Sequence, residues 1–529
     1  MEEREQNRRL MRSTLTVAAP TLLSRVFGFF RDVIQAFYLG TSRSGDAFTI
    51  AYVIPNLLRR LTGEGAMTAA FVPVFTEIKR DKRSQELWRF ANIFFFDLTL
   101  IMALLTVLGI IFSPVLIKVI AFGFKGIEGK WELTTLLTRL MFPYIFLISL
   151  AALAMAILNS FHKFFVPALT PVLFNLSIII GALLFARTAE EPAYVFAVGV
   201  VLGGVLQLAL QIPFLWRQGM RFRFGLSFAH PAVCRVAKLM VPGIFGVGIS
   251  QINFALSRMI ASFLEEGSVA SLYFASRVQE LTLGLFSIAL SIALLPTFSD
   301  LAAQRDIPGM KRTLIFSHRL VFFVTFPAMA GLLVLNRPII QVLFQRGVFD
   351  FQSTAMSASC LFFFAFSLPF ISGVKILAPA FYSLKDTKTP VIVAFFVMLS
   401  YISMSLVLMN PLRVGGVALA LSLASVINFF LLFGLLEKKI GKIDKKTILS
   451  SALKSTLSAV GMGVAVWFFI RHFDFDQLAF LEQLAVLLSA VSLGIVITIV
   501  VNLLFNHEDL RSFKDILSKD GKKGSELRR

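Results

Sequence analysis

The chain has 529 residues, of which 57% are hydrophobic and only 16% charged, and its mean hydropathy is +0.79. This composition excludes a soluble multidomain protein and predicts an all-α polytopic membrane protein. A net charge of +20 would indicate nucleic-acid binding in a soluble chain. Here most Lys and Arg residues lie in short loops between apolar segments, where they act as an orientation signal, so we expect no nucleic-acid partner.

Apolar stretches of about 20 residues or more predict fourteen transmembrane helices. In chain order they are expected at 13–38, 46–78, 90–113, 132–160, 167–186, 193–216, 239–264, 269–300, 314–336, 353–382, 389–409, 414–436, 447–470 and 481–505. No small-residue cleavage site follows the first stretch, so we expect it to stay in the mature protein and not to act as a removable signal peptide.

The basic residues are divided unequally between the two sides of the membrane. Of the 51 Lys and Arg residues, 32 fall in the termini and loops of one face and 9 in the loops of the other. Because the cytoplasmic face carries the excess of positive charge, both termini are predicted to be cytoplasmic.

An internal repeat is visible at an offset of 223 residues. Pro73 begins Pro-Val-Phe-Thr-Glu and Pro296 begins Pro-Thr-Phe-Ser-Asp, while Ser160 recurs as Ser383. The repeat predicts two pseudo-symmetric six-helix lobes followed by two added helices. An even number of helices in each lobe gives the lobes the same orientation, with a substrate site expected near mid-depth at their interface. The predicted parts are an N-terminal lobe at 1–222, a C-terminal lobe at 223–440, two additional helices at 441–510 and a basic cytoplasmic tail at 511–529.

Charged residues stand inside several predicted spans, where each charge costs a few kcal/mol or more. They include six arginines and four acids: Arg25, Arg31, Arg59, Arg60, Arg258 and Arg277, with Asp32, Asp46, Glu64 and Glu280. Such side chains are expected to face a water-filled cavity and to mark a functional site. The positive surplus predicts an anionic ligand, and planar guanidinium groups suit the oxygens of a diphosphate.

The spacing of these residues predicts which side chains share a helix face. Asn56, Arg59, Arg60 and Glu64 follow helical spacing and form one polar stripe, and the same rule pairs Arg277 with Glu280. The structural alternative is that each arginine is held by a nearby carboxylate, as Arg31 by Asp32 or Arg60 by Glu64.

Glycines beside the charges predict points of flexure. Gly28 lies between the first two arginines, and Gly63 and Gly65 flank the acid of the second span. Arg258 shares a helix face with Gln251 and is an additional candidate for the binding set.

Signals for catalysis or metal binding are weak. Cys234 and Cys360 are isolated, and the five His residues show no metal-ligand spacing, so no metal is expected. A membrane enzyme acting on lipid diphosphates would need a nucleophile or general base beside the arginines, and the sequence places none there.

Several motifs together resemble the MurJ (MviN) family of lipid II flippases, which belongs to the multidrug/oligosaccharidyl-lipid/polysaccharide exporter superfamily. The segments that carry the resemblance are Ser24–Asp32, Gly45–Phe48, Pro55–Ala66, Ala70–Pro73, Gly203–Leu208 and Lys375–Ser383. The resemblance covers nearly the whole chain, and the cluster between Ser24 and Pro73 is its most specific part.

The resemblance implies fourteen helices in two lobes around a cavity whose arginines bind the diphosphate and sugar of the substrate. By motif position, Arg25, Arg31, Arg59 and Arg277 are the implied ligands of the head group. It also implies supporting or gating roles for Asp46, Glu64 and Glu280, and a groove for the polyprenyl tail beside the two last helices.

One position departs from the family pattern. Relatives commonly read Asp-Arg in the eighth span, where this chain has Ser276 before Arg277. The departure leaves Glu280 as the expected carboxylate partner of Arg277. No acid lies between Lys238 and Phe263, so a cation site on an acidic seventh helix is not expected.

The sequence thus predicts a flippase of the bacterial inner membrane, not an enzyme, which moves lipid II by alternating access. Other candidates are an exporter of another polyprenyl-diphosphate-linked glycan and a cation-coupled drug exporter on the same scaffold. No cofactor is expected, although the membrane potential or a monovalent cation is a candidate energy source. Expected partners are lipid II, membrane lipids and other cell-wall synthesis proteins.

Overall fold

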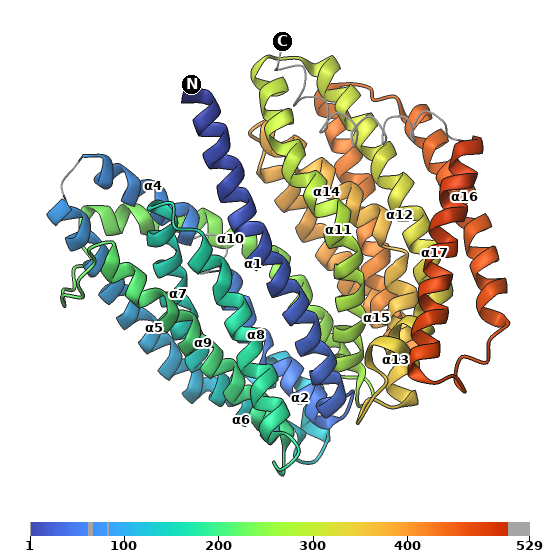
Figure 1. The fold of residues 1–529 in the computed structure, drawn as a ribbon, viewed down its shortest axis with the longest axis horizontal. Helices are drawn as coiled ribbons and strands as arrows, with labels where there is room; N and C mark the ends of the chain where they lie inside the picture. Colours follow the sequence, from blue (N-terminus) through green and yellow to red (C-terminus); the bar gives the residue numbers. More distant parts are fainter. Residues whose placement is uncertain (1, 62–66, 82–83, 506–529) are drawn as a thin grey trace. The chain divides into compact units, whose positions relative to one another are not determined.

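The computed structural model describes residues 2–61, 67–81 and 84–505, and this part of the chain is helical without any strand. Figure 1 shows the helices in chain order. They are α1 (Glu2–Leu39), α2 (Arg43–Ala51), α3 (Val53–Leu61), α4 (Met67–Arg80), α5 (Ser84–Ile120), η2 (Phe122–Gly126), α6 (Lys130–Met141), α7 (Pro143–Ser160), α8 (Phe165–Phe185), α9 (Pro192–Arg217), α10 (Pro231–Ala261), α11 (Ser268–Ala303), α12 (Ile307–Phe344), α13 (Phe351–Ala365), α14 (Leu368–Ser383), α15 (Lys388–Ile440), α16 (Lys445–Arg471) and α17 (Phe480–Phe505).

The first of two compact units comprises Met1–Ala270 and Arg346–Asp350. Within it α8 packs on α1 and α9, and α7 packs on α4, α5 and α9. Helix α10 packs on α3, α4 and α5, which explains why this unit extends beyond residue 222, the lobe boundary that the repeat predicts. The compact units are defined by contacts within the structure, whereas the lobes are defined by the repeat in the sequence. The lobes at 1–222 and 223–440 therefore remain a prediction.

The second unit comprises Ser271–Gln345 and Phe351–Arg529. Helix α12 is its hub and packs on α13, α14, α16 and α17, while α15 packs on α13 and α14. The two helices predicted as additions to the repeat, α16 and α17, therefore share a core with α12. Leu335 and Val342 of α12 meet Met462 and Val466 of α16 in that core. The predicted tail at 511–529 lies outside the described residues.

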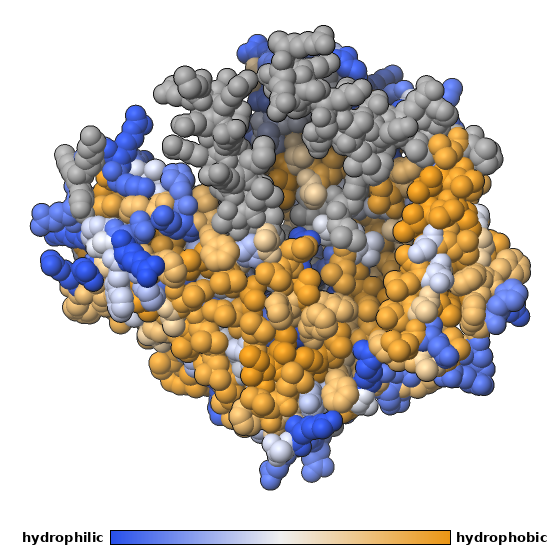
Figure 2. All heavy atoms as spheres, viewed as in Figure 1, coloured by the Kyte–Doolittle hydropathy of each residue, from blue (hydrophilic) through white to orange (hydrophobic). Residues whose placement is uncertain are grey.

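Membrane-spanning character is confirmed at the level of the fold class. Among the described helices, eight are long and apolar enough to cross a membrane, and two bent helix pairs raise this number to ten. Helix α15 is one of these eight helices, although it covers two predicted spans, 389–409 and 414–436. Its two halves meet at Arg413, whose φ of 51° and ψ of −136° are not helical. Figure 2 shows apolar side chains over much of the coloured surface, as expected for helices that face lipid.

The prediction of one continuous helix over 46–78 is wrong. Helix α2 ends at Ala51, α3 begins at Val53 and ends at Leu61, and α4 begins at Met67. Pro55 explains the first break, because it has no N–H to donate to the carbonyl of Ala51. The predicted span 132–160 agrees with one candidate span, Lys130–Ser160, in which α6 gives way to α7 just before Pro143. The predicted span 353–382 divides into α13 and α14 with a bend of 49°.

The repeat at offset 223 has a local counterpart in the backbone. Ser160 ends α7 and Ser383 ends α14. Two residues further on, His162 and Lys385 both take the left-handed conformation, with φ of 57° and 59°. Side chains with a Cβ adopt this conformation at a cost of roughly 1 kcal/mol. The two halves of the chain therefore make the same strained turn at equivalent positions.

Candidate functional site

Arg31 of α1 lies in a polar cluster within the first unit. Its guanidinium donates to Asp32 Oδ1 at 2.7 Å from Nη2 and 3.2 Å from Nε, and to Asn175 Oδ1 of α8 at 3.2 Å. Asn175 in turn donates to the carbonyl of Ser24 at 3.2 Å. The side chains of Arg31 and Asp32 are 13% and 7% exposed. Asp32 therefore holds the guanidinium of Arg31, as the structural alternative predicts. The hydrogen bond from Arg31 to Asn175 links α1 to α8.

Arg25 and Arg59 have different surroundings. Arg25 is exposed, and helical spacing puts it about a third of a turn around α1 from Arg31. Arg59 of α3 donates from Nη2 and Nε to Asn56 Oδ1 at 3.1 and 3.3 Å, so part of the predicted stripe is confirmed. Asn56 is neutral and leaves the guanidinium charge uncompensated by this contact. Both arginines thus carry positive charge on helices that the sequence marks as apolar.

Asp46 of α2 is the most enclosed of the predicted site residues. It receives Lys130 Nζ at 2.7 Å, and both side chains are 1% exposed. The backbone N–H groups of Gly267 and Ala270 donate to its two carboxylate oxygens at 2.8 Å each. Asp46 therefore holds together α2, the first residue of α6 and the residues at which α11 begins.

Close backbone approaches make this arrangement possible. Ser42 caps α2 by accepting a hydrogen bond from Gly45 N at 3.4 Å. A Cβ on Gly45 would overlap the carbonyl oxygen of Gly40, and Gly267 has a φ of 88°. The glycines of this region thus serve its packing, which the sequence did not reveal.

The pairing of Asp46 changes the charge count made from the sequence. The sequence count included Asp46 among the four acids that partly balance the six arginines, and it assigned Lys130 to a loop. The structure pairs these two residues, so Asp46 does not offset an arginine. Without Asp46, three of the four acids remain against the six arginines of the sequence count.

Arg277 of α11 forms the corresponding cluster in the second unit. Its Nη1 lies 2.8 Å from Glu280 Oε2, and its guanidinium stacks 4.8 Å from the ring centroid of Tyr273. Ser276 donates its hydroxyl to the carbonyl of Tyr273 at 2.7 Å. The expectation that Glu280 is the partner of Arg277 is confirmed, and Ser276 is bonded to its own helix.

Lys375 of α14 is a residue that sequence reasoning left out of the site. It is half-buried and interacts electrostatically with Glu280, which also pairs with Arg277. Asn175 was also missed. The signal for both was present, because each is a polar residue inside an otherwise apolar span.

Some predicted site residues cannot be placed in this geometry. Glu64, Gly63 and Gly65 lie outside the described residues, as do the side chains of Arg60 and Gln251. Gly28 lies inside the unbroken helix α1, where the nearest atom to an added Cβ would be Asn175 Nδ2 at 3.5 Å. Arg258 is half-buried in the last turn of α10. In the described part of the chain, His, Cys, Asp and Glu form no group of three or more that could hold a metal ion.

Each unit thus presents guanidinium groups on apolar helices, with acids and amides that orient them. Guanidinium groups bind phosphate oxygens through two parallel hydrogen bonds. The arrangement suits recognition of an anion.

Comparison with known proteins agrees with this chemistry. The family model described as lipid II flippase MurJ matches residues 35–486. A probable lipid II flippase MurJ of Vibrio cholerae is 35% identical over 472 residues, covering 87% of this chain and 89% of that protein. The lipid II flippase MurJ of Burkholderia cenocepacia is 35% identical over 434 residues, covering 81% and 84%.

Solved structures give the same result. A structure of lipid II flippase MurJ in an inward closed conformation matches with a TM-score of 0.79 and 28% identity, covering 93% of this chain and 99% of that one. An inward-facing multidrug transporter of the MATE family matches with a TM-score of 0.67 at 13% identity, which shows a common fold alone. The chain is a multi-pass membrane protein and belongs to the MurJ family of lipid II flippases, which are transporters and not enzymes.

Proposed function

We propose that this protein is the flippase that moves lipid II, the undecaprenyl-diphosphate-linked disaccharide pentapeptide, from the cytoplasmic to the periplasmic leaflet of a bacterial inner membrane. It would thereby serve peptidoglycan synthesis, cell-wall biogenesis and cell shape. The observation that carries the proposal is 35% identity to a lipid II flippase over 87% of the chain. The excess of Lys and Arg on one face supports cytoplasmic termini.

In this proposal Arg25, Arg59 and Arg277 bind the diphosphate. Arg25 is exposed, Arg59 is oriented by neutral Asn56, and Arg277 is oriented by Glu280 and Tyr273. Arg31 is already held by Asp32 and Asn175, so its first task is to position α1 against α8. No covalent bond changes during transport, and alternating access requires only that the cavity opens to each side in turn.

The positive surplus of the site supports coupling to the membrane potential. Moving one elementary charge across 100 mV changes the free energy by about 2.3 kcal/mol, so the potential would bias the return of an empty, positively charged carrier. Transport in proteoliposomes should therefore slow when an ionophore collapses the potential. A rate that does not change on collapse would contradict this coupling.

A related exporter of another polyprenyl-diphosphate-linked glycan would use the same arginines. Growth of a bacterium depleted of its own lipid II flippase distinguishes the two cases, because only a lipid II flippase restores peptidoglycan synthesis. We expect the wild-type chain to rescue growth and Arg277→Ala to fail at equal abundance in the membrane. Failure of the wild type to rescue, together with transport of another lipid-linked glycan in proteoliposomes, would contradict the proposed substrate.

A further inference from the structure

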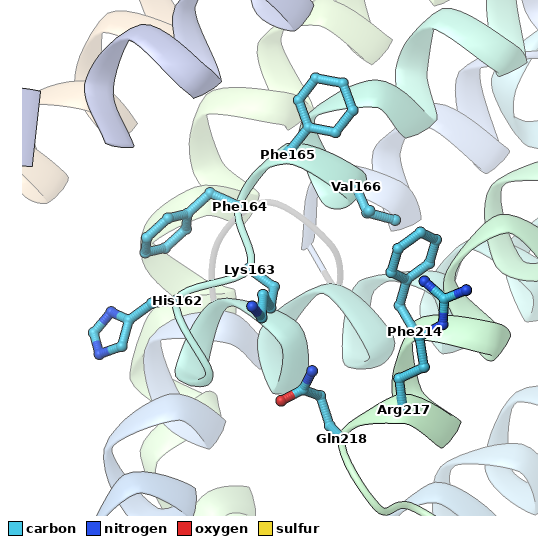
Figure 3. A pocket seen from close by; sticks show the side chains of 8 residues that line it. All are labelled: His162, Lys163, Phe164, Phe165, Val166, Phe214, Arg217 and Gln218. Carbon is cyan, nitrogen blue, oxygen red and sulfur yellow. The ribbon is translucent and has the colours of Figure 1, made fainter. Parts of the chain in front are cut away.

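A cavity of about 450 Å³ opens in the first unit where three candidate spans end. It lies between the turn that joins α7 to α8 and the last turn of α9. Figure 3 shows Lys163 and Gln218 pointing toward each other, with Arg217 beside Phe214, while the ring of His162 points away. The lining residues are His162, Lys163, Phe164, Phe165, Val166, Phe214, Arg217 and Gln218. Cationic and aromatic side chains thus line the same cavity.

The cations of this cavity have no acidic partner among the described residues. No carboxylate belongs to the described lining, and neither Lys163 nor Arg217 forms an ion pair with another described residue. Arg217 instead lies 5.4 Å from the ring centroid of Phe214. Lys79 is a useful contrast nearby, because it donates to the carbonyl of Ser160 at 2.8 Å and so has a structural task. The helix α8 that begins here also has no side-chain cap at its N-terminus.

The internal repeat shows what fills the equivalent place in the second unit. At offset 223, Lys163 corresponds to Asp386, which follows the same left-handed turn. Asp386 accepts from Lys439 Nζ at 2.7 Å and from Thr389 N at 3.0 Å. Lys439 stands in the last turn of α15, as Arg217 does in α9. A carboxylate thus joins the beginning of α15 to its end, and the break at Arg413 separates the two halves of this helix.

The first unit has the same turn and the same two helix ends but a lysine in place of that carboxylate. Positive charge from Lys163, from Arg217 and from the N-terminus of α8 therefore converges where the second unit places an anion. Val166, the counterpart of Thr389, stands in the first turn of α8. An anion from outside the chain would complete the arrangement.

We propose that this cavity binds the phosphate of an anionic membrane glycerophospholipid. Its position at the ends of three spans puts the cations at headgroup level, on the side predicted to be cytoplasmic, and basic pockets between helices at that level suit anionic headgroups. Phe165 is 50% exposed and Trp216, next to Arg217, is 47% exposed, which provides apolar surface for the acyl chains. A free phosphate ion would contact the cations alone and would leave this apolar surface uncovered.

Lipid binding by the purified chain tests the proposal directly. Phosphatidylglycerol, phosphatidylcholine and inorganic phosphate are each titrated into the protein in detergent, and binding is read by native mass spectrometry and by the thermal unfolding midpoint. We expect phosphatidylglycerol to bind about tenfold more tightly than phosphatidylcholine. The double variant Lys163→Gln/Arg217→Gln should lose this preference. Lys163→Asp should lose it as well while the fold stays intact, because it reproduces the ion pair of the second unit.

The matched control is Arg221→Gln/Lys238→Gln, which removes two exposed cations of the neighbouring loop and helix outside the cavity. It should keep the preference for phosphatidylglycerol. The proposal is overturned if the wild type shows no preference, if the cavity variants keep it, or if the control loses it equally. It is also overturned if inorganic phosphate at the same concentration gives the same stabilisation, since the site would then take a free anion. Lipid binding is measured without transport, so the proposed flippase function stands or fails separately.

Discussion

Asp46 and Lys130 form an ion pair that is almost completely enclosed, at 1% exposure for each side chain. Breaking such a pair leaves one buried charge without compensation, which typically costs about 3–5 kcal/mol. We therefore expect Asp46→Asn to lower the free energy of unfolding by about that amount. Unfolding by denaturant in detergent measures the effect.

Glu77 and Arg235 provide the matched control for this prediction. They lie 2.9 Å apart but are 56% and 57% exposed, so water screens the pair. Glu77→Gln should change the stability by less than about 1 kcal/mol. Equal effects of the two substitutions would contradict the structural role assigned to Asp46.

Substitutions of Arg25 and Arg31 distinguish a role in ligand binding from a role in stability. Arg25 is exposed, so Arg25→Ala should alter the free energy of unfolding by less than about 0.5 kcal/mol and yet abolish rescue of flippase-depleted cells. Arg31→Ala would leave Asp32 buried without its guanidinium partner and should destabilise the protein by about 3 kcal/mol. The measurements are unfolding in detergent and growth at matched membrane abundance. The distinction fails if Arg25→Ala proves as destabilising as Arg31→Ala.

At the scale of the element, Asp386 ties the beginning of α15 to its end. Hydrogen bonds from Lys439 and Thr389 lower the pKa of this carboxyl to about 2 from its usual 3.8. Because the pKa of the folded state is depressed, the stabilisation is complete above pH 3.8 and is lost as the pH falls through about 2. Lys439 is 40% exposed, so we expect about 1 kcal/mol at neutral pH. Thermal unfolding of wild type and Asp386→Asn should differ at pH 7 and converge near pH 2.

Two glycines of neighbouring helices should respond differently to an added methyl group. Gly45→Ala would press a Cβ against the carbonyl oxygen of Gly40 and should destabilise the protein by about 1–3 kcal/mol. Gly28→Ala meets only Asn175 Nδ2, at an ordinary 3.5 Å, and should be neutral or stabilising by up to about 1 kcal/mol. Thermal unfolding of the two variants measures the difference, and a larger loss for Gly28→Ala would contradict this account of the packing.

The helices themselves were predictable because apolar length decides where a chain crosses a membrane. The positions at which these helices are interrupted were harder to predict. Pro55 and Pro143 were visible in the sequence, but a proline in an apolar span can bend a helix or end it, and only the packing around it decides. The break at Arg413 was predictable, because Pro411 and Arg413 interrupt the apolar run between the predicted spans 389–409 and 414–436.

The candidate site was predictable to the extent that its chemistry lies along one helix. Arg277 with Glu280 and Arg59 with Asn56 follow helical spacing, and both contacts are present. Contacts between distant segments were not predictable from one sequence. Lys130 reaches Asp46 from 84 positions away, and its place at the border of an apolar segment gave it the appearance of a loop residue.

At the scale of the whole molecule, the account rests on arginines that bind the diphosphate of lipid II during transport. The most direct measurement is the amount of labelled lipid II that an externally added lipid-II-cleaving enzyme reaches in cells depleted of their own flippase. We predict that the wild-type chain exposes lipid II on the outer leaflet, and that Arg25→Ala and Arg277→Ala, folded and equally abundant, expose almost none. Exposure by both variants at the level of the wild type would contradict the account.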